Sequence, residues 1–168
     1  MNFPILSTLI FIPLISSFFI FLSKSQKNNN SAIYISLFSS LATLILSLFV
    51  WYSLDIGSAN FQFLEEKSWI NDSIKFKLGI DGISILFIVL TTLITPICII
   101  SCINSVKIRI KEFLIAILIL ETFMIGVFCS LDLVVFYLFF EAGLIPMFLI
   151  IGVWGGPRRV YSAFKFFL

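Results

Sequence analysis

The sequence predicts an all-α membrane protein with five transmembrane helices and the start of a sixth. Its 168 residues are 60% hydrophobic, with a mean hydropathy of +1.14. Only 12% of the residues are charged, about half of the roughly 25% that is usual in soluble domains. A soluble domain of this length could not bury so much apolar surface in one core. The apolar residues also form runs of about 20 residues, the length with which a helix crosses the hydrocarbon layer.

The first two runs, residues 3–22 and 32–52, carry no charge and predict two spans. The first run is not a secretory signal, because no basic residue precedes it and it is too long. The segment 53–78 mixes apolar, acidic and basic residues. This pattern predicts a stretch along the membrane interface, with Trp69 in the aromatic belt.

Three further runs predict spans over residues 83–103, 113–130 and 133–153. An aspartate lies just before two of them, Asp81 with Gly82 before the third span and Asp132 before the fifth. Both are expected to cap these helices by accepting hydrogen bonds from backbone N–H groups. No internal repeat and no soluble domain is visible, so residues 1–168 are expected to form one membrane domain.

The sequence Gly155-Gly156-Pro157 is expected to end the fifth helix, because glycine allows a positive φ and proline cannot continue the hydrogen-bond ladder. A new apolar segment begins at about Val160 and is too short to cross the membrane. It predicts the opening of a sixth helix, which either a second polypeptide or the rest of a longer chain is expected to complete.

The basic residues predict the orientation in the membrane. With five crossings, eight of them fall on one side, and only Lys67, Lys75 and Lys77 fall on the other. Because basic residues favour the cytoplasmic or matrix side, the N-terminus is expected outside. Arg158 and Arg159 are expected to contact lipid phosphates there. The eight residues are Lys24, Lys27, Lys107, Arg109, Lys111, Arg158, Arg159 and Lys165.

Composition excludes several classes of function. A net charge of +2 is too even for a nucleic-acid partner, and the absence of His removes bis-histidine haem and most zinc or copper sites. Of the three cysteines, Cys98 and Cys102 could share a helix face, where they are expected to be small buried hydrophobic residues. No metal or cofactor site is therefore expected in this chain.

Two carboxylates are the candidate functional residues. Glu121 and Glu141 lie near the middle of the fourth and fifth predicted spans, where a charge costs about 2.5–3.5 kcal/mol on insertion scales. A carboxyl group in such a place can take up and release protons. The alternative is that each acid joins helices through a hydrogen bond.

Two neighbours favour proton handling at Glu141. Pro146 has no N–H, so the carbonyl of Ala142 loses its helical partner and is free to bind water. Tyr137 lies one turn before Glu141 on the same face and can offer its hydroxyl. The sequence therefore predicts a proton-handling carboxylate at Glu141, with Glu121 as a second candidate.

Several motifs resemble the chain 4 family of the proton-pumping NADH:ubiquinone oxidoreductase, respiratory complex I. They are LDLVVFYLFFEAGLIPMFLIIGVWGG at residues 131–156, RVYSAFKFFL at 159–168, LGIDGIS at 78–84 and ETFMIGVF at 121–128. The resemblance covers the whole chain and about the first third of the family's length. It implies the N-terminal part of an antiporter-like fold of about fourteen membrane helices, with inverted repeats of about five helices and a lateral helix.

The resemblance also implies a role and a setting. In this family the glutamate at the place of Glu141 pairs with a lysine on the seventh helix in the input half of a proton channel, whereas the role at the place of Glu121 is less defined. The chain would then be a non-redox subunit of an H⁺-translocating NADH:ubiquinone reductase. FMN, iron–sulfur clusters and ubiquinone would lie in other subunits. Its partners would be membrane-arm subunits, membrane lipids and the polypeptide that carries the rest of the family's length.

The location and two rival functions stay open at this point. The many Phe and Ile residues resemble the AT-biased coding of organelles and favour the mitochondrial inner membrane, with the bacterial plasma membrane as the alternative. The first rival is a structural or assembly fragment of the membrane arm that has no channel of its own. The second rival is a subunit of a multi-subunit Na⁺/H⁺ antiporter.

Overall fold

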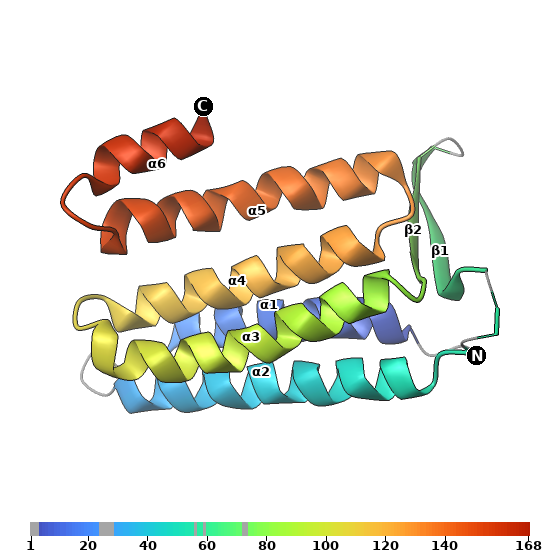
Figure 1. Cartoon of the computed structure of the whole chain (residues 1–168), viewed down its shortest axis with the longest axis horizontal. Coiled ribbons are helices and arrows are strands. Elements are labelled where there is room, and N and C mark those ends of the chain that lie inside the picture. Colours follow the sequence, from blue (N-terminus) through green and yellow to red (C-terminus); the bar gives the residue numbers. More distant parts are fainter. Residues whose placement is uncertain (1–3, 24–28, 56, 59, 72–73) are drawn as a thin grey trace.

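The computed structural model describes residues 4–23, 29–55, 57–58, 60–71 and 74–168. Long helices lie side by side, a β-hairpin crosses one end of the bundle, and a short helix folds back along α5 at the other end (Figure 1). The predicted all-α membrane class is confirmed, with the hairpin as an addition. The elements in chain order are α1 (Ile5–Leu22), α2 (Asn29–Tyr52), β1 (Gln62–Asn71), β2 (Ile74–Ile80), α3 (Ser84–Ser105), α4 (Ile110–Cys129), α5 (Leu133–Trp154) and α6 (Arg159–Phe167).

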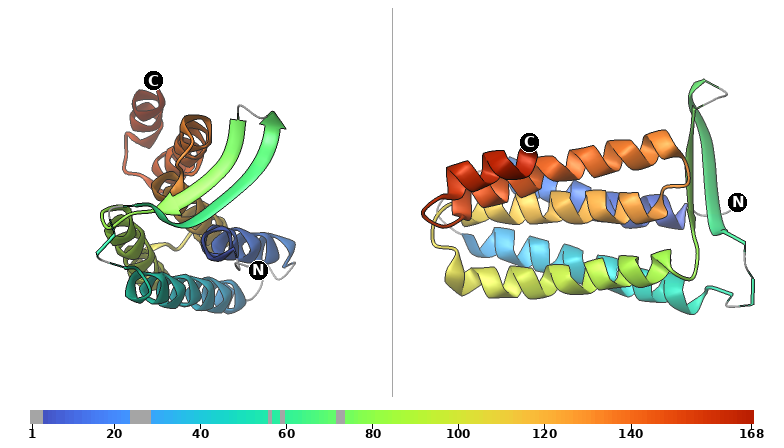
Figure 2. Two further views of the ribbon diagram at one scale, coloured as in Figure 1. Left: turned by 90° about the vertical axis from the view of Figure 1, so that its right-hand side faces the viewer. Right: turned by 45° about the horizontal axis from the view of Figure 1, so that its top comes forward.

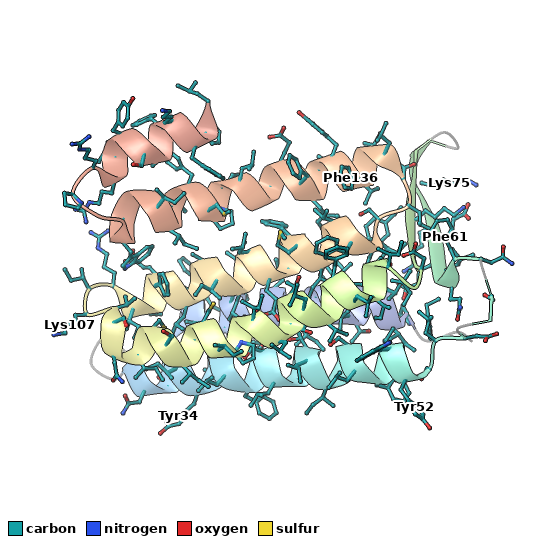
Figure 3. All side chains as sticks on the ribbon, viewed as in Figure 1. Tyr34, Tyr52, Phe61, Lys75, Lys107 and Phe136 are labelled. Atoms are coloured by element: carbon teal, nitrogen blue, oxygen red, sulfur yellow. The ribbon has the colours of Figure 1, made fainter. Side chains whose placement is uncertain are left out.

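In the described part of the chain, five helices, α1 to α5, are long and apolar enough to cross a membrane. Tyr34 and Tyr52 point outward from α2 near its two ends (Figure 3), where tyrosine is enriched in membrane helices. Lys107 and Lys75 mark opposite ends of the bundle in the same view. Lys24 and Lys27, two of the eight residues used for orientation, lie outside the described residues.

Helix α4 lies at the centre of the bundle. It packs against α1, α2, α3 and α5, and its side chains Leu114, Leu118 and Ile125 are fully buried. Helix α5 instead packs mainly against α4 and α6, so that Val135 and Pro146 are its buried residues. Most of the surface of α5 is therefore left for lipid or a protein neighbour.

The predicted interfacial segment 53–78 contains most of an antiparallel β-hairpin, which the sequence pattern did not identify as strands. Strand β1 pairs with β2 from Gln62 opposite Ile80 onwards, with an irregularity where Phe63 takes a left-handed φ of 53°. The hairpin is tied to the α4–α5 loop by Leu131, whose N–H donates to the Lys77 carbonyl over 3.0 Å. The side chain of Trp69, predicted in the aromatic belt, lies outside the described residues.

Glu65 of β1 holds the first turn of α1. Its Oε1 accepts the N–H of Leu6 over 2.7 Å, and its Oε2 accepts the N–H of Ser7 over 3.1 Å and also the Ser7 hydroxyl. The residue at the start of α1, Pro4, offers no side-chain cap. A carboxylate is well suited to this place, because the first N–H groups of a helix lack partners and carry a partial positive charge.

The two aspartates predicted as caps do accept helix N–H groups. Asp132 Oδ1 accepts from Val134 over 2.8 Å, and Asp81 Oδ1 accepts from Ser84 over 2.7 Å. Helix α5 ends just before Gly155, but the expected positive φ is wrong, because this φ is −67°. Glycine is needed there for space, since a Cβ would lie 2.3 Å from the carbonyl oxygen of Ile151.

Lowering the pH should weaken the start of α3. Hydrogen bonds from Ser84 hold the pKa of Asp81 below its ordinary value of 3.8. A depressed pKa means that the carboxylate stabilises the fold above about pH 4, and that this contribution is lost as the pH falls through the lowered pKa. We expect Asp81→Asn to cost about 0.5–1 kcal/mol at pH 7, with the difference from wild type shrinking as the pH falls below the lowered pKa of Asp81. Thermal unfolding of both proteins between pH 7 and pH 2 measures it, and a pH-independent difference would contradict it.

Candidate functional site

Glu121 is a carboxyl group in the middle of the bundle. It is 2% exposed, and its Oε1 lies 2.9 Å from the Thr43 hydroxyl of α2. Its Oε2 is buried without a hydrogen-bond partner among the described residues. Buried polar atoms of this kind are uncommon and call for an explanation such as a functional role.

The Thr43 hydroxyl faces two acceptors at once. It lies 2.9 Å from the Ser40 carbonyl and 2.9 Å from Glu121 Oε1. A hydroxyl has a single hydrogen, so it cannot donate fully to both. A proton on the Glu121 carboxyl would supply the second hydrogen bond, with Thr43 as its acceptor.

A row of buried hydroxyls extends from this contact along α2. Ser47 lies one turn from Thr43, and its hydroxyl is 2.8 Å from that of Thr92 on α3. The sequence interpretation missed this row, although its spacing of four, three and four residues is the signature of one helix face. The members on α2 are Ser36, Ser40, Thr43 and Ser47, each fully buried.

Glu141 lies on the side of α5 that no other described part of the chain covers. Its side chain is exposed among the described residues, and it lies close enough to the Tyr137 hydroxyl, one turn earlier, to interact with it. The predicted burial of Glu141 is not seen within this chain, because α5 lies at the edge of the bundle. Lipid, a neighbouring protein or a further helix of a longer chain could cover it.

The structure does not bring the two acids together. They lie at similar depth, each eight residues from the end of its helix nearest the hairpin, or ~12 Å. Helices α4 and α5 meet instead through Gly126 and Phe139, which lie on roughly the opposite faces of their helices from Glu121 and Glu141 respectively. The α4–α5 interface therefore separates an inward-facing acid from an outward-facing one.

Pro146 lies inside α5 and is buried, while Ala142, whose carbonyl it leaves without a helical donor, is half-buried. This carbonyl is adjacent in sequence to Glu141, as predicted.

At the far end of the bundle Arg158, Arg159 and Lys165 are exposed, and Arg159 donates to the Val153 carbonyl over 2.8 Å.

Within the described residues, no three His, Cys, Asp or Glu side chains are close enough to hold a metal ion. Cys102 is buried, as predicted, whereas Cys98 is exposed on the bundle surface. The prediction that both cysteines are buried is therefore wrong for Cys98 within this chain, because that side of α3 has no neighbour here.

Comparison with known proteins supports the resemblance seen in the motifs. The family model described as NADH:quinone oxidoreductase/Mrp antiporter, TM, matches residues 130–168. NADH-quinone oxidoreductase subunit M of Rickettsia prowazekii is 44% identical over 98% of this chain and 34% of the relative. NADH-ubiquinone oxidoreductase chain 4 of Marchantia polymorpha is 48% identical over 97% of this chain and 33% of the relative.

The fold is also similar to that of a solved respiratory assembly. One chain of the membrane-bound sulfane sulfur reductase, an archaeal respiratory membrane complex, superposes with a TM-score of 0.74 at 20% identity. The match covers 99% of this chain and 25% of that chain.

The present chain spans about a third of the length of the curated relatives that it matches. The sequence identity and the fold agree over nearly the whole chain, and the family model agrees over residues 130–168. The chain is therefore a multi-pass membrane protein that is homologous, over about a third of their length, to the subunit M and chain 4 proteins of the NADH:quinone oxidoreductases.

Proposed function

We propose that this chain contributes to proton translocation in the membrane arm of an NADH:ubiquinone oxidoreductase. It would act as a non-redox subunit, while FMN, iron–sulfur clusters and ubiquinone bind to other subunits. The proposal rests chiefly on one observation, the buried Glu121 carboxyl with a free oxygen beside a row of hydroxyls. The relatives, which are named as subunits of this enzyme, support it.

The chemistry that we propose is proton exchange through the two acids. Glu121 would hold a proton beside Thr43. The hydroxyls of α2, which donate to backbone carbonyls of their own helix, would accept hydrogen bonds from water and orient it toward Glu121. Glu141, with Tyr137, would exchange protons on the outer face of α5, where a further helix is needed to cover it. NADH oxidation elsewhere in the complex would drive both steps.

Other membrane-arm subunits are the proposed partners, and the proposed location is the mitochondrial inner membrane. Relatives of similar identity occur in a plant, as chain 4, and in bacteria, as subunit M. The bacterial plasma membrane is the alternative location. The rival function, a scaffold in the membrane arm without proton traffic, is favoured by the hydrogen bond between Glu121 and Thr43, which also joins α4 to α2.

The double variant Glu121→Gln/Glu141→Gln separates these two functions. In assembled complex reconstituted into sealed vesicles, we expect fewer protons pumped per electron, because glutamine keeps the shape of each side chain but cannot release a proton. Glu112→Gln is the matched control, since Glu112 lies in the first turn of the same α4 and is exposed beside Arg109. An unchanged ratio in fully assembled double variant would refute the proposal and favour the scaffold.

A further inference from the structure

An apolar groove lies between α1 and α5, with α4 as its floor. It encloses about 660 Å³, and its walls include Phe11 of α1, Phe123 of α4, and Leu138 and Ala142 of α5. The hairpin closes one end of the groove with Phe76 and Lys67. Viewed from that end, the hairpin crosses the bundle between α1 and α5 (Figure 2).

Lys67 is the charged residue of this groove. It lies two residues after Glu65 on β1 and so points to the same face of the strand, the face toward the bundle. Glu65 forms no ion pair with Lys67 among the described residues, and both of its carboxylate oxygens accept hydrogen bonds from α1. The ion pairs found among the described residues join Lys75 to Glu66 and Arg109 to Glu112, and neither includes Lys67.

We propose that this groove binds one anionic phospholipid. An acyl chain lies along the apolar walls of α1, α4 and α5, and the phosphate contacts the ammonium group of Lys67. A lysine whose stem lies on apolar surface and whose head lies at the interface suits this contact. The lipid would fill the gap between α1 and α5 and support the hairpin from below.

The hairpin favours a lipid over a neighbouring transmembrane helix. A helix seated in the groove would run into Phe76 and Lys67 at its end and could not continue into water on that side. A phospholipid ends at this level, because its head group belongs at the interface. The cation at the closed end also matches a phosphate.

Lipid retention by the full chain in detergent tests the site. Native mass spectrometry would follow dioleoyl-phosphatidylglycerol and dioleoyl-phosphatidylcholine. We expect wild type and Lys67→Arg to retain one phosphatidylglycerol in preference to phosphatidylcholine. Lys67→Gln should lower that retention about fivefold, the loss expected for one lysine at an anionic surface.

Lys75→Gln is the matched control, since it removes one charge from the same hairpin outside the groove. Ala142→Trp should reduce the retention of both lipids by filling the groove.

Several results would overturn the site. Equal retention in Lys67→Gln and wild type would exclude the head-group contact, and an equal loss in Lys75→Gln would show attraction to surface charge alone. Full retention in Ala142→Trp would exclude the groove. A photoreactive phenylalanine analogue at position 142, irradiated in native membranes, should give a phospholipid adduct, and a polypeptide adduct would show that a helix occupies the groove instead.

Discussion

Replacing Gly126 with alanine should lower the free energy of unfolding by about 2 kcal/mol, although alanine is the better helix former. A Cβ at this position of α4 would lie 2.6 Å from the ring of Phe139 on α5, with the ring's Cγ at 2.7 Å. The base of the ring cannot swing away as a flexible chain end would, so α5 must shift from α4. The thiols of Cys102 and Cys129 are buried, whereas that of Cys98 is exposed. In a Cys98→Ser background, a thiol-reactive dye can therefore follow unfolding by SDS in detergent micelles.

Gly143→Ala is the matched control, because it is the same change in the same interface. A Cβ there would lie 3.7 Å from Phe123, which is ordinary contact. This variant should be more stable than wild type by about 0.5–1 kcal/mol, since glycine weakens a helix interior. Adding Phe139→Leu to Gly126→Ala should recover part of the loss. Equal effects of the two alanine variants would contradict the assigned clash.

Glu65→Ala should lower the free energy of unfolding by about 2–3 kcal/mol, the second large effect that we expect. It removes the carboxylate that accepts two N–H groups of α1 and the Ser7 hydroxyl, and hydrogen bonds to a charged group are about twice as strong as neutral ones. Glu65→Gln should cost less, because its amide oxygen can keep one acceptor role. The same dye assay measures both variants.

Glu66→Ala is the control for Glu65→Ala. Glu66 is the next residue on β1, but it is exposed and pairs with Lys75 on the outer face over 2.6 Å. Exposed ion pairs contribute little to stability, so no resolvable change is expected. A loss as large as that of Glu65→Ala would mean that the hairpin, and not the contact with α1, carries the effect.

These two contacts also bear on the proposed function. The Gly126–Phe139 contact fixes how α4 and α5 meet, and hence the opposite directions in which Glu121 and Glu141 point. The contact of Glu65 with α1 holds the hairpin over the groove that contains Lys67. The packing variants should therefore change proton pumping only through assembly, whereas the glutamine variants should change it within assembled complex.

The sequence alone determined the class of the protein, the existence of its spans and the acids worth testing. Apolar runs of helix length predicted five spans because hydrocarbon demands about 20 residues of internally bonded backbone. The caps Asp81 and Asp132 and the pair of Tyr137 with Glu141 were predictable for the same reason: each depends on neighbours within one turn. The hairpin was missed, because its charged and apolar residues also suit an interfacial segment and pairing between strands is not local.

Only the tertiary structure decided which direction each acid faces. Glu121 and Glu141 look alike in sequence, each one carboxylate in an apolar run. The central position of α4 puts Glu121 against Thr43, and the edge position of α5 leaves Glu141 uncovered. Periodicity shows which residues share a helix face, but which neighbour that face meets depends on contacts between residues far apart in the chain. For Glu121 and Thr43 that separation is 78 residues.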